Sequence, residues 1–165
     1  MGRMHCSYRA AAISTSRHAG RVGSILRLDP RFRHALYVTV ATLFITGVAW
    51  LLADQLKDSP TGEVWQAIGA NLLMVHGGGA MVMLIMLGAL IPLHVQRSWR
   101  AGKNRIAGTA MCALNVVLVV TAFGLYYSGG DTLRIWTSDV HIVVGICLPV
   151  ALVIHIAAGR LRPVS

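Results

Sequence analysis

Residues 141–155 read HIVVGICLPVALVIH, an apolar segment with a histidine at each end and thirteen residues between them. At about 1.5 Å per residue, a helix separates these two histidines by about 21 Å along its axis. Fourteen steps of about 100° return the second ring to within about 40° of the first, so both rings lie on one helix face. Because a buried imidazole without a partner costs free energy, we expect each ring to have a partner inside the fold.

The segment belongs to one of four apolar runs, each close to the ~20 residues that cross a bilayer. None of the runs contains Asp, Glu, Lys or Arg, and they cover residues 35–53, 70–93, 106–127 and 140–159. Only 13% of the 165 residues are charged, whereas soluble domains have roughly a quarter. The sequence therefore predicts an all-α membrane protein, a bundle of four transmembrane helices.

The charges indicate the topology of this bundle. Basic residues gather before the first run, between the second and third, and after the fourth, whereas the other two loops hold mainly acids. By the positive-inside rule, both termini and the middle loop are cytoplasmic. The net charge of +9 is then a topology signal that brings contact with membrane lipid, and we expect no nucleic-acid partner.

The chain divides into three parts on this basis. Residues 1–33 are basic and lack apolar periodicity, so we expect a poorly ordered cytoplasmic tail. A start at Met4 and an Arg-rich targeting segment are the alternatives. Residues 34–160 form the transmembrane domain, and residues 161–165 a short cytoplasmic tail.

Five histidines lie in or at the ends of the predicted helices: His34, His76, His94, His141 and His155. Residues 76 and 94 are eighteen positions apart, which is five whole turns, so they also share one face. With both helices running inwards, His76 and His141 fall at one outer level. His155 and His94 fall near one inner level, as does His34.

Imidazoles that face each other at two levels suit haem, which takes two axial nitrogens from opposite sides of its plane. Glycines beside the rings, Gly79 and Gly145 among them, would leave room for a flat macrocycle. The sequence has no CxxCH motif, so we expect two noncovalent haem b groups. Ionisable residues in spans are rare and usually functional, which favours this interpretation over simple packing.

The motifs RFRHALY (31–37), MVHGGGAMVML (74–84) and DVHIVVGICLPVALVIHIAAGR (139–160) carry a family resemblance. Over residues 31–160 the chain resembles the bacterial four-helix di-haem cytochromes b, which include the cytochrome b subunits of formate dehydrogenase and nickel–iron hydrogenase. The resemblance implies that His76 and His141 hold an outer haem. It also implies that His34 and His155 hold an inner one.

The chain departs from the family in having His94, a fifth candidate. Geometry favours His94 as the partner of His155, family precedent favours His34, and we favour His34 with His94 as the alternative. Three arginines at the inner end could pair with haem propionates: Arg33, Arg97 and Arg100.

The predicted function is electron transfer through two bis-histidine haems, with no catalytic residues and no bond-making chemistry of the chain's own. The predicted location is the bacterial cytoplasmic membrane, where quinone or a redox protein would exchange electrons with the chain. The chain could act as a homodimer or as a subunit of a larger complex. The competing functions are a metal or proton transporter that uses the same histidines, and a simple membrane anchor for a partner enzyme.

Overall fold

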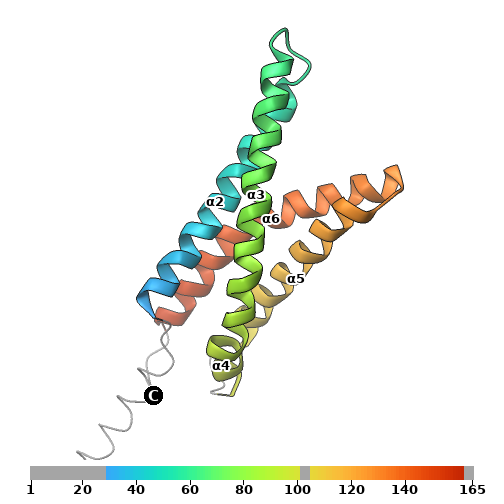
Figure 1. The fold of residues 1–165 in the computed structure, drawn as a ribbon. Helices are drawn as coiled ribbons and strands as arrows, with labels where there is room; N and C mark the ends of the chain where they lie inside the picture. The colour runs from blue at the N-terminus through green and yellow to red at the C-terminus, as the bar shows by residue number, and fades with distance from the viewer. Residues whose placement is uncertain (1–28, 101–104, 162–165) are drawn as a thin grey trace, which may run out of the picture.

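The computed structural model describes residues 29–100 and 105–161, and these form helices throughout their length apart from short turns (Figure 1). The helices are α2 (Pro30–Leu56), α3 (Gly62–Leu90), the π-helix η1 (Ile91–Val95), α4 (Gln96–Arg100), α5 (Arg105–Tyr127) and α6 (Asp131–Leu161). The predictions made for residues 1–28 and 162–165 lie outside the described residues.

The described residues contain four helical segments that are long and apolar enough to cross a membrane: Pro30–Leu56, Gly62–Arg100, Arg105–Tyr127 and Asp131–Gly159. The all-α fold with four candidate spans is thereby confirmed. Many large apolar side chains are open to the surroundings, for example Ile85 at 76% and Ile106 at 87% exposure. In water such surface would be costly, whereas lipid tails accept it. The chain therefore has the build of a multi-pass membrane protein.

Helix α2 begins earlier than the sequence analysis predicted. The Asp29 carboxylate accepts a hydrogen bond from the backbone N–H of Arg31 at 2.8 Å, which caps the helix. Pro30 occupies the first turn, where its missing N–H removes nothing from the helix. Residues 30–33, which we assigned to the tail, are consequently helical.

The helices associate as two hairpins, α2 with α3 and α5 with α6. Figure 1 shows the hairpins close together where α2 begins and α6 ends, and diverging toward their turns. Between them, α6 packs against α2. Among the described residues, α3 and α6 are not one of the closely packed helix pairs, although these two helices carry most of the histidines.

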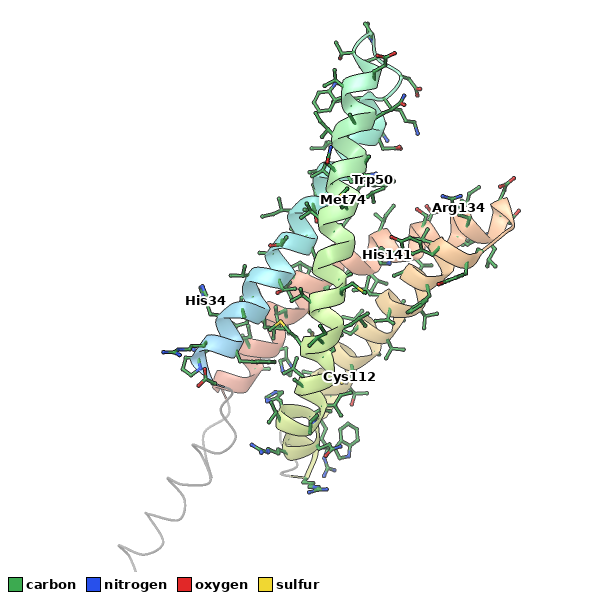
Figure 2. All side chains as sticks on the ribbon, in the orientation of Figure 1. His34, Trp50, Met74, Cys112, Arg134 and His141 are labelled. Atoms are coloured by element: carbon green, nitrogen blue, oxygen red, sulfur yellow. The ribbon has the colours of Figure 1, made fainter. Side chains whose placement is uncertain are left out.

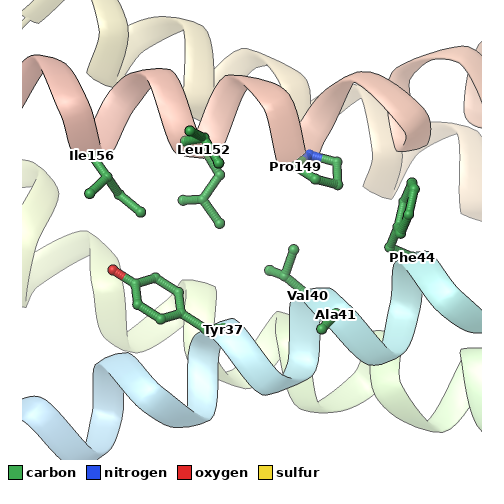
Figure 3. Close-up of a pocket in the computed structure, with 8 residues that line it drawn as sticks. Tyr37, Val40, Ala41, Phe44, Pro149, Leu152 and Ile156 are labelled. Atoms are coloured by element: carbon green, nitrogen blue, oxygen red, sulfur yellow. The ribbon is translucent and has the colours of Figure 1, made fainter.

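The buried core lies near the converging ends of the hairpins. Leu36 and Val40 of α2 pack against Met83 and Met86 of α3, and Leu152 of α6 joins them. Beside this core, α2 and α6 border an apolar groove of about 320 Å³, lined by residues such as Tyr37, Phe44, Pro149 and Ile156 (Figure 3). Its lining contributes no polar surface, as expected of a face that lies against lipid.

The prolines act differently in the two histidine-bearing helices. Around Pro92 the helix widens into η1, and the backbone N–H of Gln96 donates to the carbonyl of Ile91, five residues earlier. Proline has no N–H for the helical ladder, and a π-turn is one way for a helix to accommodate it. Helix α6, in contrast, continues through Pro149.

Candidate functional site

Two histidines from different hairpins face each other near the middle of the fold, and we call them the first pair. His76 of α3 and His141 of α6 have ring centroids 6.3 Å apart, with their planes inclined by 69°. Both side chains are half-buried. The sequence analysis placed these two residues at one level, and the structure brings them together.

A second pair of histidines repeats this arrangement between α6 and η1, the segment that continues α3. His94, in η1, and His155 of α6 have ring centroids 6.4 Å apart and an interplanar angle of 81°. The second pair lies toward the end where the hairpins converge. The two helices thus present two opposed imidazole pairs at two depths.

The spacing within each pair matches that of two imidazoles bound to one metal ion. Metal–imidazole bonds of about 2 Å, with the metal midway between the rings, place the ring centres about 6 Å apart. The observed values of 6.3 and 6.4 Å agree with this distance.

In the first pair, each imidazole has a threonine partner from the other helix of its own hairpin. Thr46 Oγ1 of α2 lies 3.0 Å from His76 Nδ1, and Thr121 Oγ1 of α5 lies 2.8 Å from His141 Nδ1. Both threonines are at most 9% exposed and are the buried polar side chains of the described part of the chain. With Nδ1 engaged, Nε2 is the nitrogen that each ring has left for another ligand.

The second pair lacks such partners. Nδ1 of His94 and Nδ1 of His155 are buried, and neither has a hydrogen-bond partner among the described residues. An unsatisfied buried polar atom costs about 1–3 kcal/mol. A group bound through Nδ1 would satisfy these atoms, whereas a group bound through Nε2 would leave them without an acceptor.

His34, which we favoured as the partner of His155, lies elsewhere. Its side chain is exposed and projects from α2 on the side away from α3 (Figure 2). The structure thus brings His94, our alternative, opposite His155. Arg33, Arg97 and Arg100 are exposed at the same end of the fold as the second pair, in keeping with the predicted depth.

The glycines predicted to make room for haem face the neighbouring helices α2 and α5. A methyl group at Gly79 would lie 3.2 Å from Leu43 of α2, and one at Gly145 would lie 3.9 Å from Leu118 of α5. Gly47 of α2 is the glycine beside a histidine, because a methyl group there would lie 3.4 Å from His76 Cε1. Any role of Gly79 and Gly145 beside a haem stays a prediction.

The sequence analysis missed Thr46 and Thr121 as site residues. In an apolar helix the hydroxyl of a threonine most often donates a hydrogen bond to the backbone carbonyl one turn earlier, and the hydroxyls of Thr46 and Thr121 are placed to do so. Nothing in the local sequence separates them from Thr39 or Thr109, which donate in the same way without contacting an imidazole. Only the packing within each hairpin identifies them.

The donor set fits haem better than a bare metal ion. No group of three or more His, Cys, Asp or Glu residues within residues 29–100 and 105–161 is arranged to hold a metal. Zinc in proteins usually takes four ligands, or three and a water. Two opposed imidazoles between apolar helices fit the protein ligands of a bis-histidine haem better than those of zinc.

Comparison with known proteins adds no assignment: no family model, curated protein or solved structure matches this chain.

Proposed function

We propose that this chain is a membrane b-type cytochrome that carries electrons between two haem sites at different depths of the bilayer. The observation that carries the proposal is the pair of facing imidazole sets, His76 with His141 and His94 with His155, each at the spacing of two ligands on one metal ion. Haem bound at each set would supply reversible one-electron chemistry at its iron.

The chain itself positions the ligands of the two proposed haem sites. Helix α3 with its continuation η1 carries one imidazole of each pair and α6 carries the other, so that every site joins the two hairpins. With two imidazoles of the chain bound to each haem iron, the iron would have no position left for oxygen or substrate. This arrangement supports electron transfer and no bond-making chemistry.

In this proposal His94 replaces His34 as the second ligand of the inner site. The support is its 6.4 Å centroid distance from His155 and the burial of both unpartnered Nδ1 atoms, against the exposure of His34. His34, with Tyr37 one turn further along α2, would then lie near the lipid-facing surface, where a quinone could exchange protons and electrons with the chain.

The location and partners follow from the same hypothesis. In this proposal both termini and the middle basic loop face the cytoplasm of a bacterium, with the first pair toward the outer face, and the positive-inside rule supports this orientation. Electrons would reach the chain from quinone or from a partner redox protein. A homodimer or a larger complex would cover part of the exposed apolar surface.

A spectrum tests the proposal directly. The full chain is purified in detergent after expression with ample haem, and the dithionite-reduced minus oxidised absorption spectrum is recorded with the haem content per chain. We expect sharp b-type bands and two haems per chain. Absence of haem would refute the proposal, and metal analysis of the same sample would then test the transporter alternative.

Single substitutions identify the ligands of the inner site. His94→Ala should reduce the haem content from two to one per chain, whereas His34→Ala should leave two. His76→Ala serves as a positive control, because it removes a ligand of the other site. Retention of two haems in His94→Ala together with loss of one in His34→Ala would restore the assignment implied by the family resemblance.

A further inference from the structure

Two threonines with the same surroundings flank the first pair. In α2, the Thr46 hydroxyl lies 2.7 Å from the Thr42 carbonyl oxygen, to which it donates, and 3.0 Å from His76 Nδ1. In α5, the Thr121 hydroxyl donates to the Val117 carbonyl oxygen at 2.7 Å and lies 2.8 Å from His141 Nδ1. The same threonine–histidine contact thus occurs once in each hairpin.

A hydroxyl has one hydrogen to donate, and this fixes its role toward the imidazole. Each hydroxyl has a backbone carbonyl oxygen at 2.7 Å, which can only accept, and when the hydroxyl donates there its oxygen lone pairs remain for the ring nitrogen. The ring nitrogen must then be the donor, so Nδ1 carries the proton. A neutral imidazole protonated at Nδ1 has its free lone pair on Nε2, the nitrogen available to a metal.

We infer that Thr46 and Thr121 are positioning residues, which set the tautomer and the orientation of both imidazoles of the first pair and make this site electronically different from the second. The inference rests on the proposed function insofar as it concerns haem. When the ring nitrogen that does not bind the metal donates a hydrogen bond, the basicity of the ligating imidazole increases, and this favours the oxidised metal. Nδ1 of His94 and Nδ1 of His155 have no such acceptor among the described residues.

The chain offers matched variants for a test. Thr46→Val and Thr121→Val keep the side-chain shape and remove the hydroxyl, and Thr46→Ser and Thr121→Ser restore it. Thr39→Val and Thr109→Val are the controls, because these threonines of α2 and α5 also donate to the carbonyl one turn earlier but contact no imidazole.

The first readout needs no haem. In the full chain, labelled with 15N-histidine and reconstituted in lipid nanodiscs without haem, nitrogen chemical shifts report the tautomer of each ring. We expect His76 and His141 to be protonated at Nδ1. Thr46→Val should release only His76 into a tautomer mixture, Thr121→Val only His141, and the serine variants should restore the fixed tautomer.

The second readout uses the chain loaded with haem. Thr46→Val and Thr121→Val should raise the midpoint potential of one of two couples, and a tenfold change in its reduced-to-oxidised ratio would appear as 59 mV. Loss of such a partner typically weakens metal binding by about 10–100-fold, so haem affinity at this site should also fall. The other couple and both control variants should match the wild type.

The outcomes separate the two hypotheses. If the chain takes up no haem but the tautomers respond as expected, the proposed function fails while the positioning role of the threonines holds. If two haems bind, and neither tautomer, potential nor affinity responds to the valine variants, the positioning role is refuted while the proposed function stands.

Discussion

Replacing Gly124 by alanine should loosen the second hairpin and disturb the first histidine pair. A methyl group at this position would lie 2.7 Å from Thr137 Cγ2 and 3.4 Å from Thr137 Oγ1. Thr137 cannot easily rotate away, because its hydroxyl donates to the Leu133 carbonyl at 2.7 Å. Carbon atoms make favourable contact at about 3.5–4.0 Å, so α5 and α6 would have to separate by roughly 1 Å at this point.

This separation has two expected consequences. Overpacking of this kind costs about 1–3 kcal/mol, partly offset by a gain of up to ~1 kcal/mol in helix propensity, so the free energy of unfolding should fall by about 1–2 kcal/mol. Thr121 lies one turn before the substitution and His141 one turn after Thr137. Their 2.8 Å contact should therefore lengthen beyond hydrogen-bonding distance, which weakens haem binding at the first pair.

Reversible unfolding in mixed detergent micelles measures the stability, and haem content per chain measures the site. Gly88→Ala in α3 is the matched control, because nothing lies within 4 Å of a methyl group there and the change should be neutral or stabilising. If Gly124→Ala were as stable as Gly88→Ala and bound two haems equally well, the close packing of α5 on α6 described above would be refuted.

Three further predictions concern the site and the helix ends. Gly47→Val should force the His76 ring aside, because even one methyl group at this position would lie 3.4 Å from Cε1 of that ring. Haem titration should then show weaker binding at one site. Gly108→Val, which lies in open space, should leave haem binding at both sites intact. Asp29→Ala removes the cap of α2 and should lower the free energy of unfolding by about 1 kcal/mol, whereas Asp29→Asn should restore most of it in the same micelle assay. Haem at a free concentration of 100 times its dissociation constant should stabilise the folded chain by about 2.7 kcal/mol for each occupied site. In thermal melts, haem should therefore raise the melting temperature of His155→Ala, which keeps one site, by less than that of the wild type. An equal rise in both would exclude binding at the second pair.

The four candidate spans could be predicted because they depend on composition alone. Long apolar runs free of charge must form helices in a membrane, since every backbone group needs a partner inside its own segment. The opposed positions of His76 and His141 could also be predicted. Helical periodicity gives the face of each histidine, and the alternating direction of successive spans gives its depth. The start of α2 at Pro30 was missed, although Asp29 and Pro30 are a recognisable capping pair.

Other features depend on packing that a sequence does not contain. The position of His94 depends on η1, because a π-turn changes the rotation between residues 76 and 94 from that of a continuous α-helix. The threonine contacts depend on how closely each hairpin closes, which the glycines at 79 and 124 help to determine. Gly79 and Gly145 contact neighbouring helices, which small residues in membrane helices commonly do, and their role beside a cofactor stays a prediction.

The assembly of the chain from two hairpins has a consequence for its biogenesis. Each hairpin contains its own threonine–histidine contact, Thr46 with His76 and Thr121 with His141, whereas both histidine pairs join one hairpin to the other. A ribosome delivers the first hairpin to the membrane before the second exists, so His76 can be oriented early. The first pair cannot be completed until translation has passed residue 141, and the second pair not until it has passed residue 155. Cofactor capture would thus be the last event of maturation, and it would act as a checkpoint that distinguishes a finished chain from a truncated one.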